Sequence, residues 1–232
     1  MSLKAPIGFE VWRHRVRSLT RFITLGKVTI PAVGVFDTGV VSVPAGGTVD
    51  VTVPDDEVWL ITSVNYDYAG YICVAIYDGV NTSLCSNVYT DSRIGGSRTF
   101  ASVNVPVKGG WVIRIMNRYT GGAFRARVTG FKLDASVATV IGGVIPVSGG
   151  SYGTIEKPAD GKYFYFFTYA QTVGDGTYQG CIYHCGISDC SLVGCSYYYV
   201  EWSGVADDPH ALSIYTRITA NFLLLGLGVL AP

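Results

Sequence analysis

The chain has 232 residues, of which 49% are hydrophobic, 15% charged and 13% aromatic, and its formal net charge is zero. Disordered chains combine low hydrophobicity with a high net charge, so this composition excludes disorder and predicts one large or two small folded cores. The longest apolar run, Phe222 to Val229 and on to Ala231, is shorter than the ~20 residues of a membrane-spanning helix. The N-terminus also lacks the apolar core of a secretory signal.

Residues 1–30 are the basic part of the chain, with six Lys and Arg side chains against Glu10 alone. Within Phe9 to Ile23, apolar residues recur at spacings of three and four, which predicts an amphipathic helix. Such a helix either docks on an outside partner, such as a neighbouring protein, an anionic membrane or nucleic acid, or packs on its own domain with solvated arginines. The residues assigned to partner binding are Trp12, Arg13, Arg15, Arg17 and Arg21.

From residue 31 onward, apolar and polar residues alternate, as in Val49, Val51 and Val53, and Gly-rich turns separate the alternating runs. This rhythm predicts β-strands that form a sandwich or a barrel. The stretch 39–47 aligns with 143–151 at an offset of 104 residues, and the same offset places Trp59 on Tyr163. We therefore expect a basic arm at 1–30 and two tandem β-sandwiches at 31–135 and 136–232.

The six cysteines are placed symmetrically about candidate turns. If the chain folds back near Gly79 and near Gly186 to Asp189, each cysteine faces another, in the pairs Cys73 with Cys85, Cys181 with Cys195, and Cys185 with Cys190. Cross-strand disulfides are the leading interpretation. Buried free thiols and a metal site that includes His184 remain alternatives, although the spacing suits zinc poorly.

No catalytic, cofactor-binding or metal-binding residue is assigned. Gly149-Gly150-Ser151-Tyr152-Gly153 matches the nucleophile elbow in letters, but strand-type residues follow where a helix is needed. The chain is therefore expected not to be an enzyme and to use no cofactor and no small-molecule substrate.

Two features suggest contact surfaces. The second half is rich in tyrosine, which supplies rigid amphipathic contact area. The closing strand lacks polar alternation, so both of its faces are expected to be covered by the sister domain or another subunit. The residues assigned to this interface are Phe222, Leu223, Leu224 and Leu225.

The Gly-punctuated, Tyr-rich sandwiches behind a basic arm, with Gly47 to Pro54 leading into Trp59 to Val64, resemble the jelly-roll structural proteins of icosahedral archaeal viruses and phages. The resemblance implies an all-β fold of two jelly-roll-like sandwiches and a non-enzymatic capsid, vertex, turret or decoration protein located in the virion. The implied partners are other capsid subunits in a homo- or hetero-oligomer, and an internal membrane or the genome through the arm. The alternative is a carbohydrate-binding or adhesive sandwich protein, whose Tyr and Trp side chains would stack on sugars.

Overall fold

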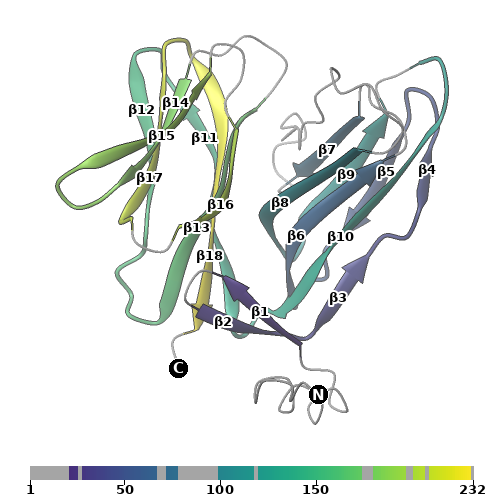
Figure 1. Ribbon diagram of the computed structural model, residues 1–232, viewed down its shortest axis with the longest axis horizontal. Coiled ribbons are helices and arrows are strands. Elements are labelled where there is room, and N and C mark those ends of the chain that lie inside the picture. Colours follow the sequence, from purple (N-terminus) through teal and green to yellow (C-terminus); the bar gives the residue numbers. More distant parts are fainter. Residues whose placement is uncertain are drawn as a thin grey trace, which may run out of the picture.

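The computed structural model describes residues 21–25, 28–66, 72–77, 99–117, 120–173, 180–196, 201–206 and 209–230. These residues form strands β1 to β18 and no helix, so the fold of the described chain is all-β (Figure 1). Accordingly, none of the described segments is a long apolar helix of the kind that crosses a membrane.

The strands between residues 34 and 134, here called the first half, form two sheets. One sheet has the order β3-β10-β6-β8, with β4 also paired to β10, and the other has the order β5-β9-β7. Their bounds are β3 Gly34–Asp37, β4 Val41–Val43, β5 Thr48–Thr52, β6 Glu57–Tyr66, β7 Ile72–Tyr77, β8 Thr99–Lys108, β9 Val112–Asn117 and β10 Phe124–Asp134. Alternating side chains explain the sandwich, because Trp59 and Ile61 of β6 and Ile113 and Ile115 of β9 are buried in one cluster between the sheets.

The second half, between residues 138 and 230, repeats this arrangement. One sheet has the order β11-β18-β13-β16 and the other has the order β12-β17-β14-β15. Their bounds are β11 Ala138–Val147, β12 Ser151–Glu156, β13 Tyr163–Val173, β14 Gly180–Cys185, β15 Cys190–Ser196, β16 Glu201–Ala206, β17 Ala211–Thr216 and β18 Ala220–Leu230. Phe167 and Leu224 on one sheet pack with Ile182 and Leu212 on the other.

The two halves share details that chance identities in sequence cannot explain. Strand β6 has an extra residue at Thr62, where pairing to β10 jumps from Ile61 to Ser63. Strand β13 has the same irregularity at Thr168, where pairing to β18 jumps from Phe167 to Tyr169. Pairing of β6 to β8 and of β13 to β16 breaks at these same positions, with two residues skipped on the partner strand. Because bulges persist in related folds, this match supports the predicted duplication.

The halves meet through the sheets that contain β6 and β18, which we call the inner sheets; the sheets that contain β5 and β12 are the outer sheets. Even-numbered Val58 and Leu60 of β6 turn away from Trp59 and pack with Leu227 and Val229 of β18. In Figure 1, β13 and β18 accordingly run between the outer sheet of the second half and the first half. Each large apolar side chain buried here contributes about 1.5–3 kcal/mol, so the halves form one packed body.

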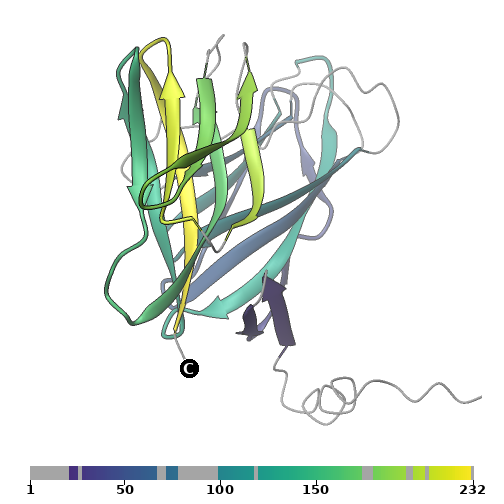
Figure 2. The same ribbon diagram turned by 60° about the vertical axis from the view of Figure 1, so that its left-hand side comes forward.

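A hairpin precedes the first half. Strands β1 (Arg21–Leu25) and β2 (Val28–Ala32) pair antiparallel, with Ile23 opposite Ile30. The hairpin lies at the same end of the molecule as the end of β18 (Figure 2). The helix predicted over Phe9 to Ile23 is therefore wrong at Arg21 to Ile23, where β-branched and aromatic residues pair as a strand. The rest of that helix, residues 9–20, lies outside the described residues.

Candidate interaction surfaces

The described part of the predicted basic arm is small. Trp12, Arg13, Arg15 and Arg17 lie outside the described residues, and Arg21 is the first residue of β1. The hairpin contacts β10 through β2, and it lies at the end of the molecule where β18 also finishes (Figure 2).

Two predicted cysteine pairs are disulfides that cross the hairpin β14–β15. Cys181 bonds to Cys195 and Cys185 bonds to Cys190, with Cα separations of 4.1 and 4.0 Å. The strand register places each pair directly opposite, because a one-residue irregularity between Ile182 and Tyr183 absorbs the difference in spacing. These four sulfurs are therefore not available to a metal, so the alternative of a metal site built from these cysteines and His184 is not formed in the described residues.

The third predicted pair cannot be placed in this way. Cys73 lies on β7, whereas Cys85 lies outside the described residues, so the pair Cys73 with Cys85 stays a prediction.

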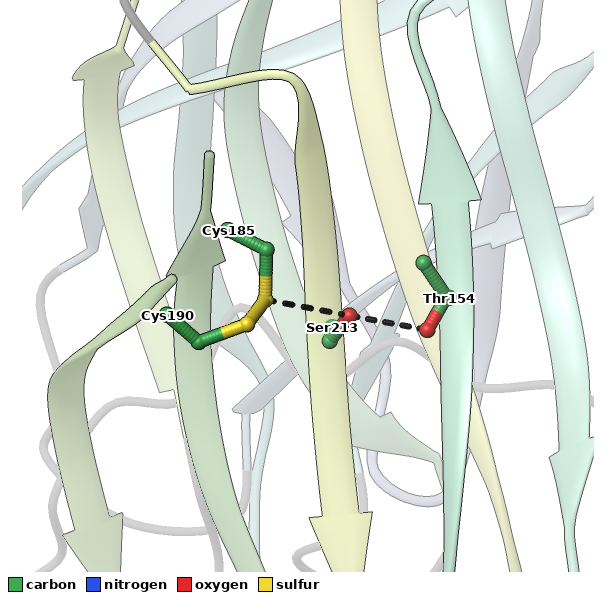
Figure 3. Close-up of a disulfide and its surroundings, with 4 residues drawn as sticks. All are labelled: Thr154, Cys185, Cys190 and Ser213. Atoms are coloured by element: carbon green, nitrogen blue, oxygen red, sulfur yellow. Dashed lines mark hydrogen bonds between the residues drawn. A yellow bond between two sulfur atoms is a disulfide. The ribbon is translucent and has the colours of Figure 1, made fainter. Parts of the chain in front are cut away.

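The disulfide between Cys185 and Cys190 lies beside a row of hydroxyl groups (Figure 3). The Sγ of Cys185 lies 3.6 Å from the Oγ of Ser213, which lies 2.8 Å from the Oγ1 of Thr154. A disulfide sulfur carries no proton, so Ser213 donates to the sulfur and Thr154 donates to Ser213. This chain ties the disulfide to β17 and β12 and fixes the outer sheet across its width.

The outer sheet of the second half presents a surface on which this hydroxyl row is flanked by tyrosines. Register places Tyr152, Tyr215, Cys181 and Cys195 in one row across the four strands. The next row is Thr154, Ser213, Tyr183 and Leu192. We call the non-cysteine members of these two rows the tyrosine face: Tyr152, Thr154, Tyr183, Leu192, Ser213 and Tyr215.

The three rings of the tyrosine face are in contact. The ring centroid of Tyr152 lies 5.1 Å from that of Tyr215 and 5.8 Å from that of Tyr183, with the rings tilted by 50° and 57°. Tyr152 is 62% exposed and Leu192 is 60% exposed. Burial raises the pKa of Tyr183, and the neighbouring Tyr152 raises it further. The phenol of Tyr183 therefore stays neutral and can both donate and accept hydrogen bonds.

Sequence reasoning noted the tyrosine-rich second half but did not predict that Tyr152, Tyr183 and Tyr215 lie together on one surface. The alternation of Tyr152 with Gly153, which is buried, was a local signal that Tyr152 faces outward. Its closeness to Tyr183 depends on strand order, because β17 lies between β12 and β14.

The corresponding face of the first half is charged. The pair of residues 49 and 115 on β5 and β9 corresponds to the pair of residues 153 and 214 on β12 and β17. The neighbouring pair, Asp50 and Arg114, therefore occupies the place of Thr154 and Ser213. The guanidinium of Arg114 donates two hydrogen bonds of 2.6 Å to the carboxylate of Asp50. A similar pair joins Arg127 to Asp37, where the guanidinium lowers the pKa of the carboxyl to about 2.

The closing strand is covered on both faces, as expected. All residues from Phe222 to Val229 are buried. Phe222 and Leu224 face the interior of the second half, and Leu223 and Leu225 pack with the core of the first half. The first half of the same chain therefore covers one face of β18, and the outer sheet of the second half covers the other.

The described titratable residues do not converge on a catalytic or metal site. Among the residues placed by the structure, no group of three His, Cys, Asp or Glu side chains could hold a metal ion. Burial, and then the charge of Lys157, lowers the pKa of His184. Ser151 of the elbow-like sequence starts strand β12, so the strand-turn-helix geometry of a nucleophile elbow is not formed there.

Comparisons with known proteins give structural likeness without sequence likeness. No protein-family model and no curated protein matches the sequence. The major capsid protein P2 of bacteriophage PM2 is 10% identical, with a TM-score of 0.35, and the match covers 83% of this chain and 98% of P2. The MCP of STIV is 9% identical, with a TM-score of 0.27, and the match covers 84% of this chain and 95% of that one.

A third solved structure is described as a triple jelly-roll fold and turret assembly in an archaeal virus. It is 11% identical, with a TM-score of 0.26, and the match covers 83% of this chain and 59% of that one. The chain thus resembles capsid proteins of a bacteriophage and of archaeal viruses, as the sequence resemblance predicted.

Proposed function

We propose that this chain is a structural protein of a virion, built from two jelly rolls at 31–135 and 136–232. The observation that supports this most strongly is the strand order. Numbered within the second half, the eight strands pair as first, eighth, third, sixth and as second, seventh, fourth, fifth. This order arises when a long antiparallel hairpin is rolled into a two-sheet sandwich, as in the jelly rolls of viral capsids.

The first half supports the same arrangement, with one difference. Its first strand is divided into β3 and β4, both of which pair with β10, and the remaining described strands fall into equivalent places. The break between β3 and β4 occurs around Gly39, whose φ of 67° turns the chain. In the second half, β11 continues through the corresponding residues without a break.

The packing between the inner sheets supports a structural role. One cluster joins Phe36, Trp59 and Ile113 of the first half to Tyr169 and Leu225 of the second, so the halves present a single rigid body to their neighbours. A shell subunit needs fixed angles between its contact surfaces, and close-packed interiors supply that stiffness.

The basic residues before β1 provide a second contact in this proposal. Lys4, Arg13, Arg15 and Arg17 precede the hairpin, with Glu10 as the only acid among residues 1–20. Such a segment is attracted to anionic partners, which in a particle are the genome and the lipids of an internal membrane. It also suits an acidic patch on a neighbouring subunit.

The experiment that tests the proposal is incorporation into particles. Full-length chain and a variant lacking residues 1–20 would be tagged and expressed in cells that produce the virus, and particles would be purified on a density gradient. We expect the full-length chain to sediment with the particles and the truncated chain to be depleted from them while remaining folded in the lysate. A full-length chain that stays at the top of the gradient would overturn the virion role. Normal incorporation of the truncated chain would overturn the role of the arm alone.

A further inference from the structure

The tyrosine face contrasts with its structural counterpart in the same molecule. Both faces are outer surfaces of equivalent sheets, yet the first half places the ion pair of Asp50 and Arg114 where the second half has Thr154 and Ser213. Thr48, opposite Met116, likewise occupies the place of Tyr152, opposite Tyr215. The fold alone therefore does not require tyrosines on this surface.

The tyrosine face has a charged row as its boundary on one side. Its neighbours in the next row change character, with Glu156 opposite Ala211. The carboxylate of Glu156 lies 3.9 Å from the imidazole of His210, which marks a polar boundary.

The chemistry of the tyrosine face limits the charge of its occupant. Its six residues carry no ionised group, so it offers neither cations for phosphates nor anions for basic peptides. It offers aromatic surface, phenol groups and the hydroxyl pair of Thr154 and Ser213. A complementary ligand is uncharged, rich in hydroxyl groups and has flat apolar patches, and these are the properties of a neutral sugar.

The arrangement of the rings limits the length of the ligand. Because Tyr183 and Tyr215 are tilted by 57° and 50° against Tyr152, the three rings form an uneven surface and not a coplanar wall. Their centroid separations of 5.1 and 5.8 Å are comparable to the length of one pyranose unit. Such a surface suits one or two sugar rings and not an extended polysaccharide.

The tyrosine face is also held in place before a ligand arrives. Disulfides at Cys181 and at Cys185 fasten β14 to β15 on either side of Tyr183, and the hydrogen-bonded row of Thr154 and Ser213 links β12 to β17. Preorganisation of this kind reduces the entropic cost of binding. We propose that the tyrosine face is a binding site for a short neutral glycan, with a pyranose ring stacked on Tyr152.

The test is saturation-transfer NMR on the full-length chain with four neutral disaccharides at millimolar concentration: cellobiose, maltose, lactose and N,N′-diacetylchitobiose. We expect at least one of them to receive saturation at its ring protons. Tyr152→Ala is expected to weaken that binding about tenfold or more, because an aromatic anchor dominates a small site. Tyr152→Phe, which keeps the ring, should retain most of it.

The matched control is Thr48→Ala, at the equivalent exposed place on β5, which should bind as the unaltered chain does. Circular dichroism spectra would establish that each variant is folded. Because the side chain of Tyr152 is exposed, we expect both of its variants to fold. The proposal is overturned if none of the four sugars receives saturation, or if Tyr152→Ala and Thr48→Ala bind as well as the unaltered chain. It is independent of the virion role, because either result can occur in a protein that is incorporated into particles.

Discussion

At the scale of single residues, the most consequential polar group in the described core is Asn117. Its side chain is 2% exposed, and its Nδ2 donates to the carbonyl oxygens of Val43, Pro44 and Gly122 at 3.2, 3.1 and 2.8 Å. It thereby ties the end of β9 to two loops. Thr216, the equivalent residue at the end of β17, is also buried and bonds to Ile218. Sequence patterning did not identify either residue, because the carbonyl groups that they bind lie in loops whose position depends on the tertiary fold.

Replacing Asn117 tests this role. Asn117→Asp removes the donor and sets a carboxylate against three carbonyl oxygens, and an unsatisfied buried group alone costs about 1–3 kcal/mol. We expect a marked loss of unfolding free energy at pH 7. The loss should shrink as pH falls, because the introduced carboxyl has a raised pKa in the folded state and regains a donor when protonated.

Urea titrations at pH 7 and pH 4.5 measure both effects. The control is Asn65→Asp on β6, where the half-buried amide donates to the Oγ of Ser63 at 3.2 Å. Equal stability losses for the two variants at pH 7 would show that the three carbonyl contacts do not matter.

At the scale of elements, the hairpin β14–β15 was predictable in unusual detail. Mirror spacing of cysteines about a turn gave both pairings, because opposite residues of an antiparallel ladder have nearly constant index sums. The helix predicted at the N-terminus is wrong at its last residues, Arg21 to Ile23, which belong to strand β1. A period of 3.6 can be met by chance in a short segment, and pairing of Arg21–Leu25 with Val28–Ala32 decides the local structure there.

The two disulfides are expected to stabilise the protein unequally. On a chain-entropy estimate, closing the 5-residue separation is worth about 2 kcal/mol and closing the 14-residue separation about 3 kcal/mol. Because the loops are nested, closing one shortens the other, so the effects add to less than their sum. Cys181→Ser with Cys195→Ser should therefore lower the Tm more than Cys185→Ser with Cys190→Ser.

Differential scanning calorimetry of the two double variants, without added oxidant or reductant, measures the two Tm values and shows which is lower. Peptide mapping of the unaltered chain without reductant checks the pairing itself, including Cys73 with Cys85. Free thiols at Cys181 and Cys195 would contradict the stapled hairpin.

Strand β18 supports both halves at once. Leu224 and Leu225 are both fully buried, but Leu224 lies in the core of the second half and Leu225 in the cluster shared with the first. Leu224→Ala and Leu225→Ala should each cost about 2–5 kcal/mol. Leu225→Ala should also loosen the halves from one another, so that its unfolding separates into two transitions.

Hydrogen exchange resolved by peptide identifies which half opens first in each variant. Leu230→Ala serves as the control, because Leu230 ends the strand and is 39% exposed. If Leu225→Ala unfolds in a single transition at the same temperature as the control, β18 does not couple the halves.

At the scale of the whole molecule, sequence and structure agree on the all-β fold. Alternation and glycine turns were sufficient for this, since both are local. The order of strands within sheets, the matching bulges at Thr62 and Thr168 and the gathering of Tyr152, Tyr183 and Tyr215 were not predictable. Each depends on which strands become neighbours, and a period of two carries no information about that choice.

The measurement that most directly tests the virion role is the number of copies of this chain per genome in purified particles. Isotope-labelled peptides from the two halves, quantified by mass spectrometry against genome copies from the same gradient fraction, give this number. We expect many copies per particle, in constant ratio to the major shell protein through successive purifications. A copy number below one per particle that falls with each purification step would contradict a structural role in the virion.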